Sequence, residues 1–302
     1  MEYYEVAGTQ VQTYRNLKMK KLIIPVLALL ALGACNQAPR GEVMARAVPE
    51  RADDFVFEND LIAGRFYGKA LEGNPTSPGI DIWVKLPGKL VANEWYAKAM
   101  EHGDYYHHDH GGKDCYKVAV SLGGGASAIL VDGVLQFPAT NYRSYEILAS
   151  EPDSAVFVLH YPEWENGTVK VALDKKVTVT GGTYFCKVED TYNFTGTDSL
   201  VVAAGIFRHK QQGTIEEEAH SSNRIAIWEK ASDQSAEPED GMIGVAVVVP
   251  GAEYVGLSLD GTHSIASKTI AQGETFCYMF GSCWSKAGIG DAQSWFDLVR
   301  SI

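Results

Sequence analysis

Short runs of alternating hydrophobic and polar residues make up most of the chain after residue 54. SAVFVLHY, TVKVALDKKVTVT, GGTYFCKVEDTYNF, SLVVAAGIF, NRIAIWEK and MIGVAVVVP are rich in β-branched and aromatic residues, as are FVFENDLIAGRFYG and GIDIWVKL. A period of two places successive side chains on opposite faces of a strand. Glycine-containing turns such as ENG, TGG and LDG follow several of these runs. The pattern predicts antiparallel β-sheets.

Helical patterns are few. The segment NEWYAKAMEH is compatible with one short helix. Near the C-terminus, four apolar residues from Trp295 to Ile302 recur at positions i, i+3, i+4 and i+7, and Asp291 is a suitable N-cap. This spacing predicts a C-terminal helix that packs its apolar stripe on a sheet.

The element pattern predicts an all-β fold, a large antiparallel β-supersandwich with few short helices and a C-terminal helix. Strands that follow one another without intervening helices exclude a doubly wound α/β fold. No linker is visible after Phe55, so residues 55–302 are predicted to form a single β-sandwich domain. That length is well above the ~100 residues of an immunoglobulin-type sandwich, so the sheets should be large.

Residues 1–34 have the character of a signal region. Three lysines precede an apolar run that is too short to span a bilayer, and small residues precede Cys35. This resembles a bacterial lipoprotein signal, which implies translation from Met19, cleavage before Cys35 and a lipid on its sulfur. Residues 35–54 lack apolar periodicity and are predicted to be a lipidated tether. The protein would then be anchored to the outer membrane, facing the periplasm or the cell surface.

Charge and composition restrict the partners. The formal net charge is −12, and removal of residues 1–34 would leave 22 basic and 36 acidic residues, a charge of −14. Such a surface repels phosphate backbones, so a nucleic-acid partner is not expected. A local cationic pocket could still bind an anionic sugar. The 15 tyrosines and 6 tryptophans suit a sugar-binding cleft and a β-sheet core equally well.

Four cysteines remain in the mature chain, namely Cys115, Cys186, Cys277 and Cys283. In an oxidising compartment they permit zero, one or two disulfides. Cys277 and Cys283 are close enough in sequence to bridge a turn. All four are equally compatible with small buried apolar residues.

The segment HGDYYHHDHGGKDCYKV, residues 102–118, holds four of the eight histidines within nine positions. If the segment is extended, His108 and His110 share one face, and His107 and Asp109 share the other. Two histidines on one face predict a divalent metal site, although no HExxH or paired CxxC framework accompanies them. The alternative is acid/base chemistry, because imidazole titrates near neutral pH.

Several neighbours of these histidines suit the acid/base interpretation. Tyr105, Tyr106 and Tyr116 would supply phenols, and Asp109 or Asp114 could fix an imidazole tautomer. A solvated loop is the simpler explanation for any single histidine. For the whole cluster we favour a functional surface, because three imidazoles within four residues offer no obvious packing advantage.

Other candidates lie further along the chain. In GIFRHKQQG, Arg208, His209 and Lys210 place positive charge at a strand end of an acidic protein, which suits the carboxylate of a uronic acid. A solvated strand end is the alternative. Trp164, in HYPEWENG, and Trp228 are candidate platforms for sugar stacking.

The segments ENDLIAGRFYG, GIDIWVK, YYHHDHGGKDCYKVAVSLGGG and TNYRSYEIL together resemble a family of uncharacterised lipoproteins with a domain of unknown function, from polysaccharide-degrading gut bacteria. The resemblance covers the chain from about Phe55 to Ile302. It implies a galactose-mutarotase-like supersandwich and genes clustered for the degradation of plant or algal polysaccharides. More distant relatives with that fold include mutarotases and polysaccharide lyases, a link of fold alone.

These features predict a carbohydrate-active protein, most simply a polysaccharide lyase on a uronic-acid-containing glycan. Arg208 would neutralise the carboxylate, and a histidine or Tyr116 would take the C5 proton. A hydrolase or epimerase using Glu163 or Glu165, and a non-catalytic glycan-binding lipoprotein, are the alternatives. No cofactor is required, and a divalent metal at His108 and His110 is a further option. The predicted catalytic residues are His107, His108, His110, Tyr116, Arg208 and His209, and the predicted substrate contacts are Tyr105, Tyr106, Asp109, Trp164, Lys210 and Trp228.

Overall fold

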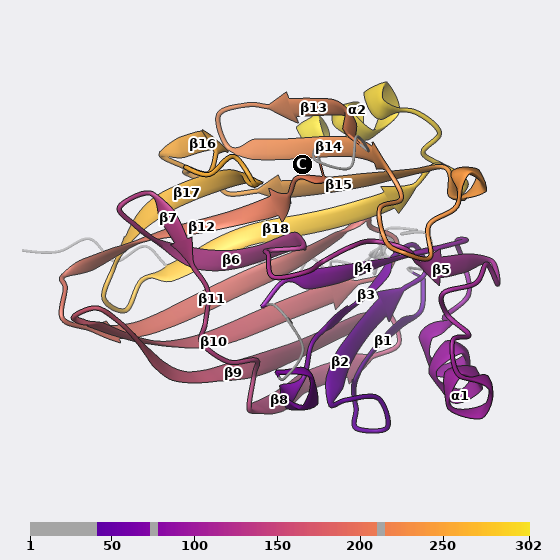
Figure 1. Cartoon of the computed structure of the whole chain (residues 1–302), viewed down its shortest axis with the longest axis horizontal. Coiled ribbons are helices and arrows are strands. Elements are labelled where there is room, and N and C mark those ends of the chain that lie inside the picture. The colour runs from indigo at the N-terminus through magenta and orange to yellow at the C-terminus, as the bar shows by residue number, and fades with distance from the viewer. Residues whose placement is uncertain (1–40, 73–77, 210–214) are drawn as a thin grey trace, which may run out of the picture. The chain divides into compact units, whose positions relative to one another are not determined.

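The computed structural model describes residues 41–72, 78–209 and 215–302, with the backbone alone at positions 216 and 217. This part of the chain folds into three antiparallel sheets and two α-helices, so the all-β sandwich expected from the sequence is confirmed (Figure 1). Each alternating run of the sequence forms one strand or a pair of strands.

The sheets differ in size. The first has the order β1 (Val43–Val48), β2 (Asp54–Asn59), β3 (Ala63–Phe66), β4 (Ile80–Lys85) and β5 (Gly112–Asp114). The second has the order β13 (Ile215–His220), β14 (Arg224–Lys230), β15 (Met242–Val248), β18 (Thr275–Trp284), β11 (Phe185–Thr195), β10 (Val169–Thr180), β9 (Ser154–Asn166) and β8 (Ser144–Glu151). The third has the order β16 (Tyr254–Leu257), β17 (His263–Ala271), β12 (Ser199–Phe207), β6 (Gly124–Val131) and β7 (Val134–Gln136).

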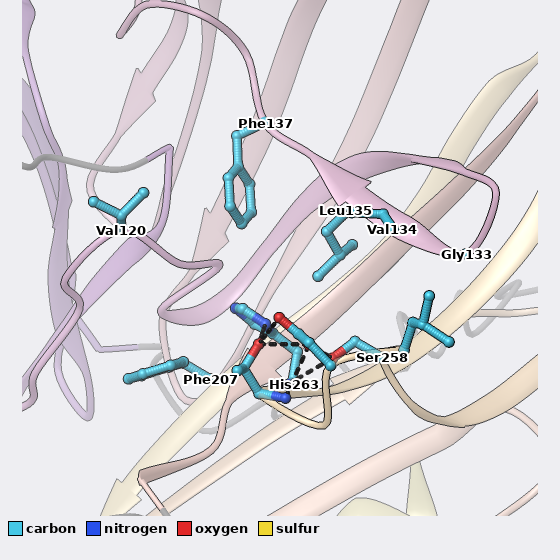
Figure 2. Close-up of a pocket in the computed structure, with 11 residues that line it drawn as sticks. Val120, Gly133, Val134, Leu135, Phe137, Phe207, Ser258 and His263 are labelled. Atoms are coloured by element: carbon cyan, nitrogen blue, oxygen red, sulfur yellow. Dashed lines mark hydrogen bonds between the residues drawn. The ribbon is translucent and has the colours of Figure 1, made fainter.

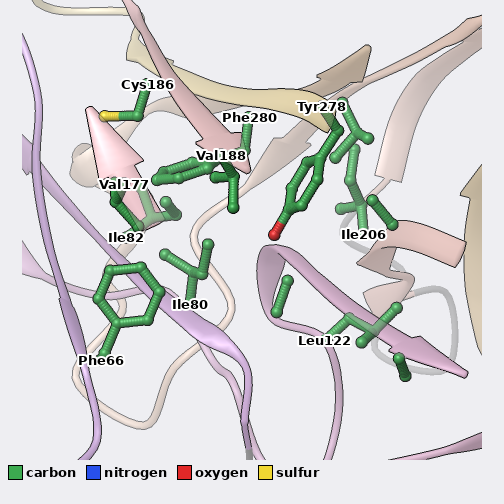
Figure 3. Packing of buried hydrophobic residues seen from close by; sticks show 14 of the residues in the cluster. Phe66, Ile80, Ile82, Leu122, Val177, Cys186, Val188, Ile206, Tyr278 and Phe280 are labelled. Atoms are coloured by element: carbon green, nitrogen blue, oxygen red, sulfur yellow. The ribbon is translucent and has the colours of Figure 1, made fainter. Parts of the chain in front are cut away.

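The two five-stranded sheets together form one layer, which packs on the eight-stranded sheet. A parallel bridge between Ile80 and Gly123 links the two smaller sheets. Side chains from all three sheets meet in one hydrophobic core, to which Ile82 of β4, Ile206 of β12 and Phe280 of β18 all contribute (Figure 3). The core explains the alternation in long strands such as β9 and β10, where every second residue is buried over most of the strand.

The two helices cover outer faces of the sheets. In α2 (Ala292–Ser301), the Asp291 side chain accepts a hydrogen bond from the Ser294 backbone N–H at 2.8 Å, and the Trp295 ring stacks on Phe185. The predicted C-terminal helix and its cap are therefore confirmed, although Ile302 at its end is exposed. The predicted short helix is α1 (Ala92–His102), which packs on the outer face of the first sheet.

Part of the predicted tether belongs to the sandwich. Residues 43–48 form β1, which pairs antiparallel with β2 along its whole length. Ala45 and Val48 are its buried residues, and their spacing of three produces no visible alternation in the sequence. The prediction of a tether through residue 54 is therefore wrong, while Cys35 lies outside the described residues.

Cysteines 115, 186, 277 and 283 are free thiols in the structure. Cys277 and Cys283 lie on the same strand, β18, and not on two sides of a turn. Six residues of extended chain separate their Cα atoms by about 20 Å, far beyond the reach of a disulfide. A bridge between them, which the sequence left open, is therefore excluded. Cys115, Cys186 and Cys283 are buried and pack as small apolar side chains.

A polar network lies inside the core. Lys175 on β10 faces Asp190 on β11, and its ammonium donates to the two carboxylate oxygens at 2.9 and 2.7 Å. It also donates to Ser127 Oγ and to Tyr278 OH, at 3.1 Å each, and Ser127 donates to Asp190. Because both charges are paired and hydrogen-bonded, the network can be tolerated at full burial.

We expect Lys175→Met to lower the free energy of unfolding by about 3–5 kcal/mol, because Asp190 would remain buried without its cation. Lys176→Met is the matched control. Lys176 follows in the same strand and pairs with Glu189 near the surface at 3.2 Å, so its loss should cost about 1 kcal/mol or less. Urea unfolding at pH 7 measures both variants, and equal losses would contradict the structural role of the network.

Candidate active site at the histidine segment

The histidine segment forms a compact turn between α1 and β5. The Asp109 carboxylate accepts hydrogen bonds from the backbone N–H groups of Gly111 and Gly112, at 2.9 and 3.1 Å. Both glycines have positive φ angles, which a strand of other residues would not adopt. His108 and His110 are exposed on this turn and do not share a strand face. The extended strand on which the predicted His108–His110 metal site depended is therefore not present in this segment.

Arg65 lies beneath this turn, at the centre of a buried charged cluster. Its guanidinium donates to Asp81 Oδ2 and to Asp114 Oδ2, both at 2.8 Å, and lies 3.6 Å from Asp54 Oδ2. The four side chains are almost fully buried. The strand register explains the arrangement, because Arg65 on β3 is directly opposite Asp81 on β4, and β4 pairs with β5. Three carboxylates thus share one guanidinium.

Aromatic rings close off this cluster. The Arg65 guanidinium lies 5.2 to 5.4 Å from the ring centroids of Trp83, Tyr106 and Tyr67. The Tyr106 ring stacks on Trp83, and its hydroxyl accepts a hydrogen bond from Arg51 at 3.1 Å. Tyr106, a predicted sugar contact, is therefore buried as a packing residue. Its neighbour Tyr105 is partly exposed.

Tyr67 and Asp81 form a proton-holding pair within the cluster. The Tyr67 hydroxyl donates to Asp81 Oδ2 at 3.0 Å. Burial, together with the nearby Asp114 charge, raises the pKa of Asp81 to about 8. Burial and the Asp81 charge also raise the pKa of the Tyr67 phenol well above its usual range. Since Tyr67 is partly exposed, the pair connects the buried carboxyl group with the surface.

His107 is the one histidine of the turn that contacts the buried cluster. Its Nδ1 is hydrogen-bonded to Asp104, and its Nε2 lies 3.5 Å from Asp114 Oδ2. The interaction with Asp114, with a smaller contribution from Asp104, raises the pKa of His107 to about 9. Without a bound cation, His107 is therefore mainly an imidazolium at neutral pH, and its position differs from that of the exposed His108 and His110.

A distant loop contributes Asp233 to the same place. Its backbone N–H donates to the Cys115 carbonyl at 3.2 Å, and Ser235 Oγ donates to the Asp114 carbonyl at 2.8 Å. These bonds fix the loop after β14 on the strand end that carries Asp114. One potential ligand atom each of His107, Asp114 and Asp233 lies within 4.8 Å of the others.

The predicted cationic strand end has a different role. Arg208 donates to Glu218 at 2.9 and 3.1 Å. Burial alone would raise the pKa of Glu218, but hydrogen bonds from His220, Ser264 and Arg208 outweigh it and lower the pKa to about 2. The guanidinium is thus already paired with a carboxylate of the protein. His209 is buried with Nε2 donating to a backbone carbonyl. Lys210 lies outside the described residues.

Three further predicted site residues are buried. Tyr116 is 1% exposed, and burial raises the pKa of its phenol well above the usual range. Trp164 packs in the main core, and Trp228 packs in a smaller cluster beneath α2. None of the three can contact a polysaccharide in this structure. Their aromatic and polar character had predicted a surface, but the sheets around them supply enough apolar area to bury them.

The sequence does not single out Arg65, Tyr67, Asp81 or Asp233. A signal for two of them was present, because Arg65 in AGRFYG and Asp81 in GIDIWVK are charged residues within otherwise apolar strands. A buried charge requires a partner, which points to a polar cluster between those strands. Asp233 carries no such signal, because a loop brings it to the cluster.

A cavity of about 300 Å³ lies between β7 and the β16–β17 hairpin. Phe137 and Leu135 lie on one side of it, and Phe207 and His263 on the other (Figure 2). His263 Nε2 accepts the Leu122 N–H at 3.1 Å, and Nδ1 is 2.8 Å from Thr262 Oγ1. Burial lowers the pKa of His263 to about 4, so the ring is a neutral structural group.

Residues 28–302 match the family described as Domain of unknown function (DUF4861), and the chain therefore belongs to that family. It is 30% identical over 257 residues to "Uncharacterized protein P7" of Formosa agariphila. The match covers 80% of this chain and 62% of the relative, so the chain spans less than two thirds of that protein's length.

The buried His263 predicts a loss of stability in acid. The folded state holds His263 with a pKa of about 4, against about 6.5 when unfolded. Stability is therefore complete above pH 6.5 and falls by about 1.4 kcal/mol per pH unit as the pH drops towards 4. We expect His263→Leu to be less stable than the wild type at pH 7.5, and the gap to narrow by about 2 kcal/mol at pH 5. Urea unfolding at both pH values tests this, and an unchanged gap would contradict it.

Proposed function

We propose that this protein is a carbohydrate-active enzyme that cleaves a uronic-acid-containing polysaccharide by β-elimination at the histidine segment. The observation that carries the proposal is the Tyr67–Asp81 pair, which shares a buried charged cluster with His107. Such a pair can deliver a proton at neutral pH. The family resemblance in the sequence indicates a plant or algal polysaccharide, and the uronic acid is the substrate expected from the sequence.

In this reaction a base removes the C5 proton of the uronic acid. The electron pair forms a C4–C5 double bond, the C4–O4 bond breaks, and the leaving O4 takes a proton. We assign that proton to Tyr67, whose phenol is protonated at neutral pH. Asp81, with a pKa of about 8, is hydrogen-bonded to Tyr67 and can return the proton. No water is consumed.

Among the predicted candidates for the base that removes the C5 proton, we keep two, His108 and His110. Tyr116 is buried, and both nitrogens of His107 face carboxylates. His108 and His110 are exposed, and the His110 ring stacks on Tyr105 with centroids 3.8 Å apart and planes within 6°. Because this stack fixes the orientation of the ring, we assign the role of base to His110.

We also propose that the chain is attached to the outer membrane through a lipid on Cys35. The support is the signal-like segment before this cysteine. In the described part of the chain, no helix combines the length and the hydrophobicity needed to cross a bilayer. The two-layer arrangement of the sheets is compatible with the galactose-mutarotase-like supersandwich that the resemblance implies.

The proposed function is tested by incubating the protein with pectic, algal and arabinogalactan polysaccharides and following the ultraviolet absorbance of the unsaturated uronide. We expect Tyr67→Phe and His110→Gln to lose about 10²–10⁴-fold in rate, since each removes a proton-transfer group. His102→Gln is the matched control, because His102 is exposed at the end of α1, and its activity should be unchanged.

Mass spectrometry of the products separates the reaction types. Elimination adds nothing to the summed mass of the products, whereas hydrolysis adds one water. Products that carry an added water would replace the lyase with a hydrolase. Absence of any new absorbance on all three classes of glycan would overturn the proposal.

A further inference from the structure

The histidine turn, the end of β5 and the loop after β14 converge on one point. His107 contributes an imidazole nitrogen, and Asp114 and Asp233 each contribute a carboxylate oxygen, all within 4.8 Å of one another. We propose that these three residues bind a divalent transition-metal ion. This site is different from the pair of His108 and His110 that the sequence alternation predicts.

Asp114 provides an independent indication of a missing ligand. It is 1% exposed, and its Oδ2 lies 2.8 Å from Arg65 Nη2 and 3.5 Å from His107 Nε2. Within the described parts of the chain, its other oxygen, Oδ1, has no hydrogen-bond partner. A buried carboxylate oxygen without a partner is costly, by roughly 1–3 kcal/mol or more. A cation between Asp114 and His107 would satisfy that oxygen.

The surroundings of His107 are those of a metal ligand. Metal-bound imidazoles usually donate their second N–H to a carboxylate or a carbonyl, which fixes the tautomer and the ring orientation. The Asp104 carboxylate already binds His107 Nδ1, and Nε2 faces the other two ligands. Asp104 is therefore a positioning residue for the site.

The other two ligands are held just as firmly. Arg65 orients the Asp114 carboxylate, and the backbone N–H of Asp233 is bonded to the Cys115 carbonyl. Asp54 and Asp81 share the Arg65 guanidinium with Asp114, and Asp54 is paired in addition with Arg51 at 3.1 Å.

The ligand set indicates the class of metal. Mg²⁺ and Ca²⁺ prefer sites made entirely of oxygen, whereas an imidazole with two carboxylates suits Zn²⁺ or Mn²⁺. Three protein ligands leave positions open for water or a substrate oxygen, as in catalytic sites. Metal binding itself does not depend on the proposed function. The ion could also hold the uronate carboxylate, a role that Arg208 cannot fill because it is paired with Glu218. That role rests on the proposed function.

The test uses the full chain, freed of metal by a chelator and then titrated with Zn²⁺, Mn²⁺ and Ca²⁺ by calorimetry. We expect one Zn²⁺ or Mn²⁺ per chain, bound at least tenfold more tightly than Ca²⁺. Asp233→Asn and His107→Gln should abolish binding, and Asp104→Asn should weaken it about 10–100-fold. Visible absorption of the Co²⁺-loaded protein should lose its signature in the same variants.

Two control variants, His108→Gln and His110→Gln, should leave the affinity unchanged, because both residues are exposed on the turn and neither belongs to the three-residue cluster. Urea unfolding of each metal-free variant checks that the fold is retained. Failure of Zn²⁺ and Mn²⁺ to bind the wild type, or unchanged binding by Asp233→Asn, would overturn the metal site. The uronide assay would then decide the proposed function on its own. Conversely, stoichiometric metal binding without glycan cleavage would support the metal site and overturn the proposed function.

Discussion

The buried Arg65 guanidinium is the interaction on which the candidate site depends. It connects Asp54 on β2, Asp81 on β4 and Asp114 on β5, so it joins neighbouring strands of the first sheet at their charged positions. Arg51 pairs with Asp54 as a second cation. Burial, together with the Asp114 charge, raises the pKa of Asp81, and the Asp114 carboxylate raises the pKa of His107.

The buried network around Lys175 and Asp190 differs from the Arg65 cluster. Lys175 and Asp190 form a balanced pair, and the neighbouring hydroxyl groups complete their hydrogen bonds. Nothing further is needed there, which is why we treat it as structural. In the Arg65 cluster, Asp81 Oδ1 and Asp114 Oδ1 are both without partners among the described residues. These unpartnered carboxylate oxygens distinguish the candidate site from the Lys175 network.

The sequence predicted the fold better than the site. Alternation identified the strands, because a strand with one buried face carries its signal locally, and the Asp291 cap identified the C-terminal helix. The sequence identified the histidine segment as a candidate site, but it did not predict the conformation of the segment. Glycines and Asp109 turn the chain where an extended strand had been assumed. The prediction that Trp164 is an exposed platform for sugar stacking was wrong for a general reason. Burial depends on contacts between distant strands, which residue type alone does not reveal.

The residues of the site come from two kinds of structure. Arg65, Asp81 and Asp114 stand on paired strands, whose register fixes their positions, whereas His107 and Asp233 come from a turn and a loop. A loop ligand keeps its geometry only if its backbone is anchored, and Asp233 is anchored on the carbonyl of Cys115. A cation held between sheet and loops would therefore tie the loop after β14 to the histidine turn. Because binding stabilises only the folded arrangement, the ion would order the surface that carries the exposed histidines.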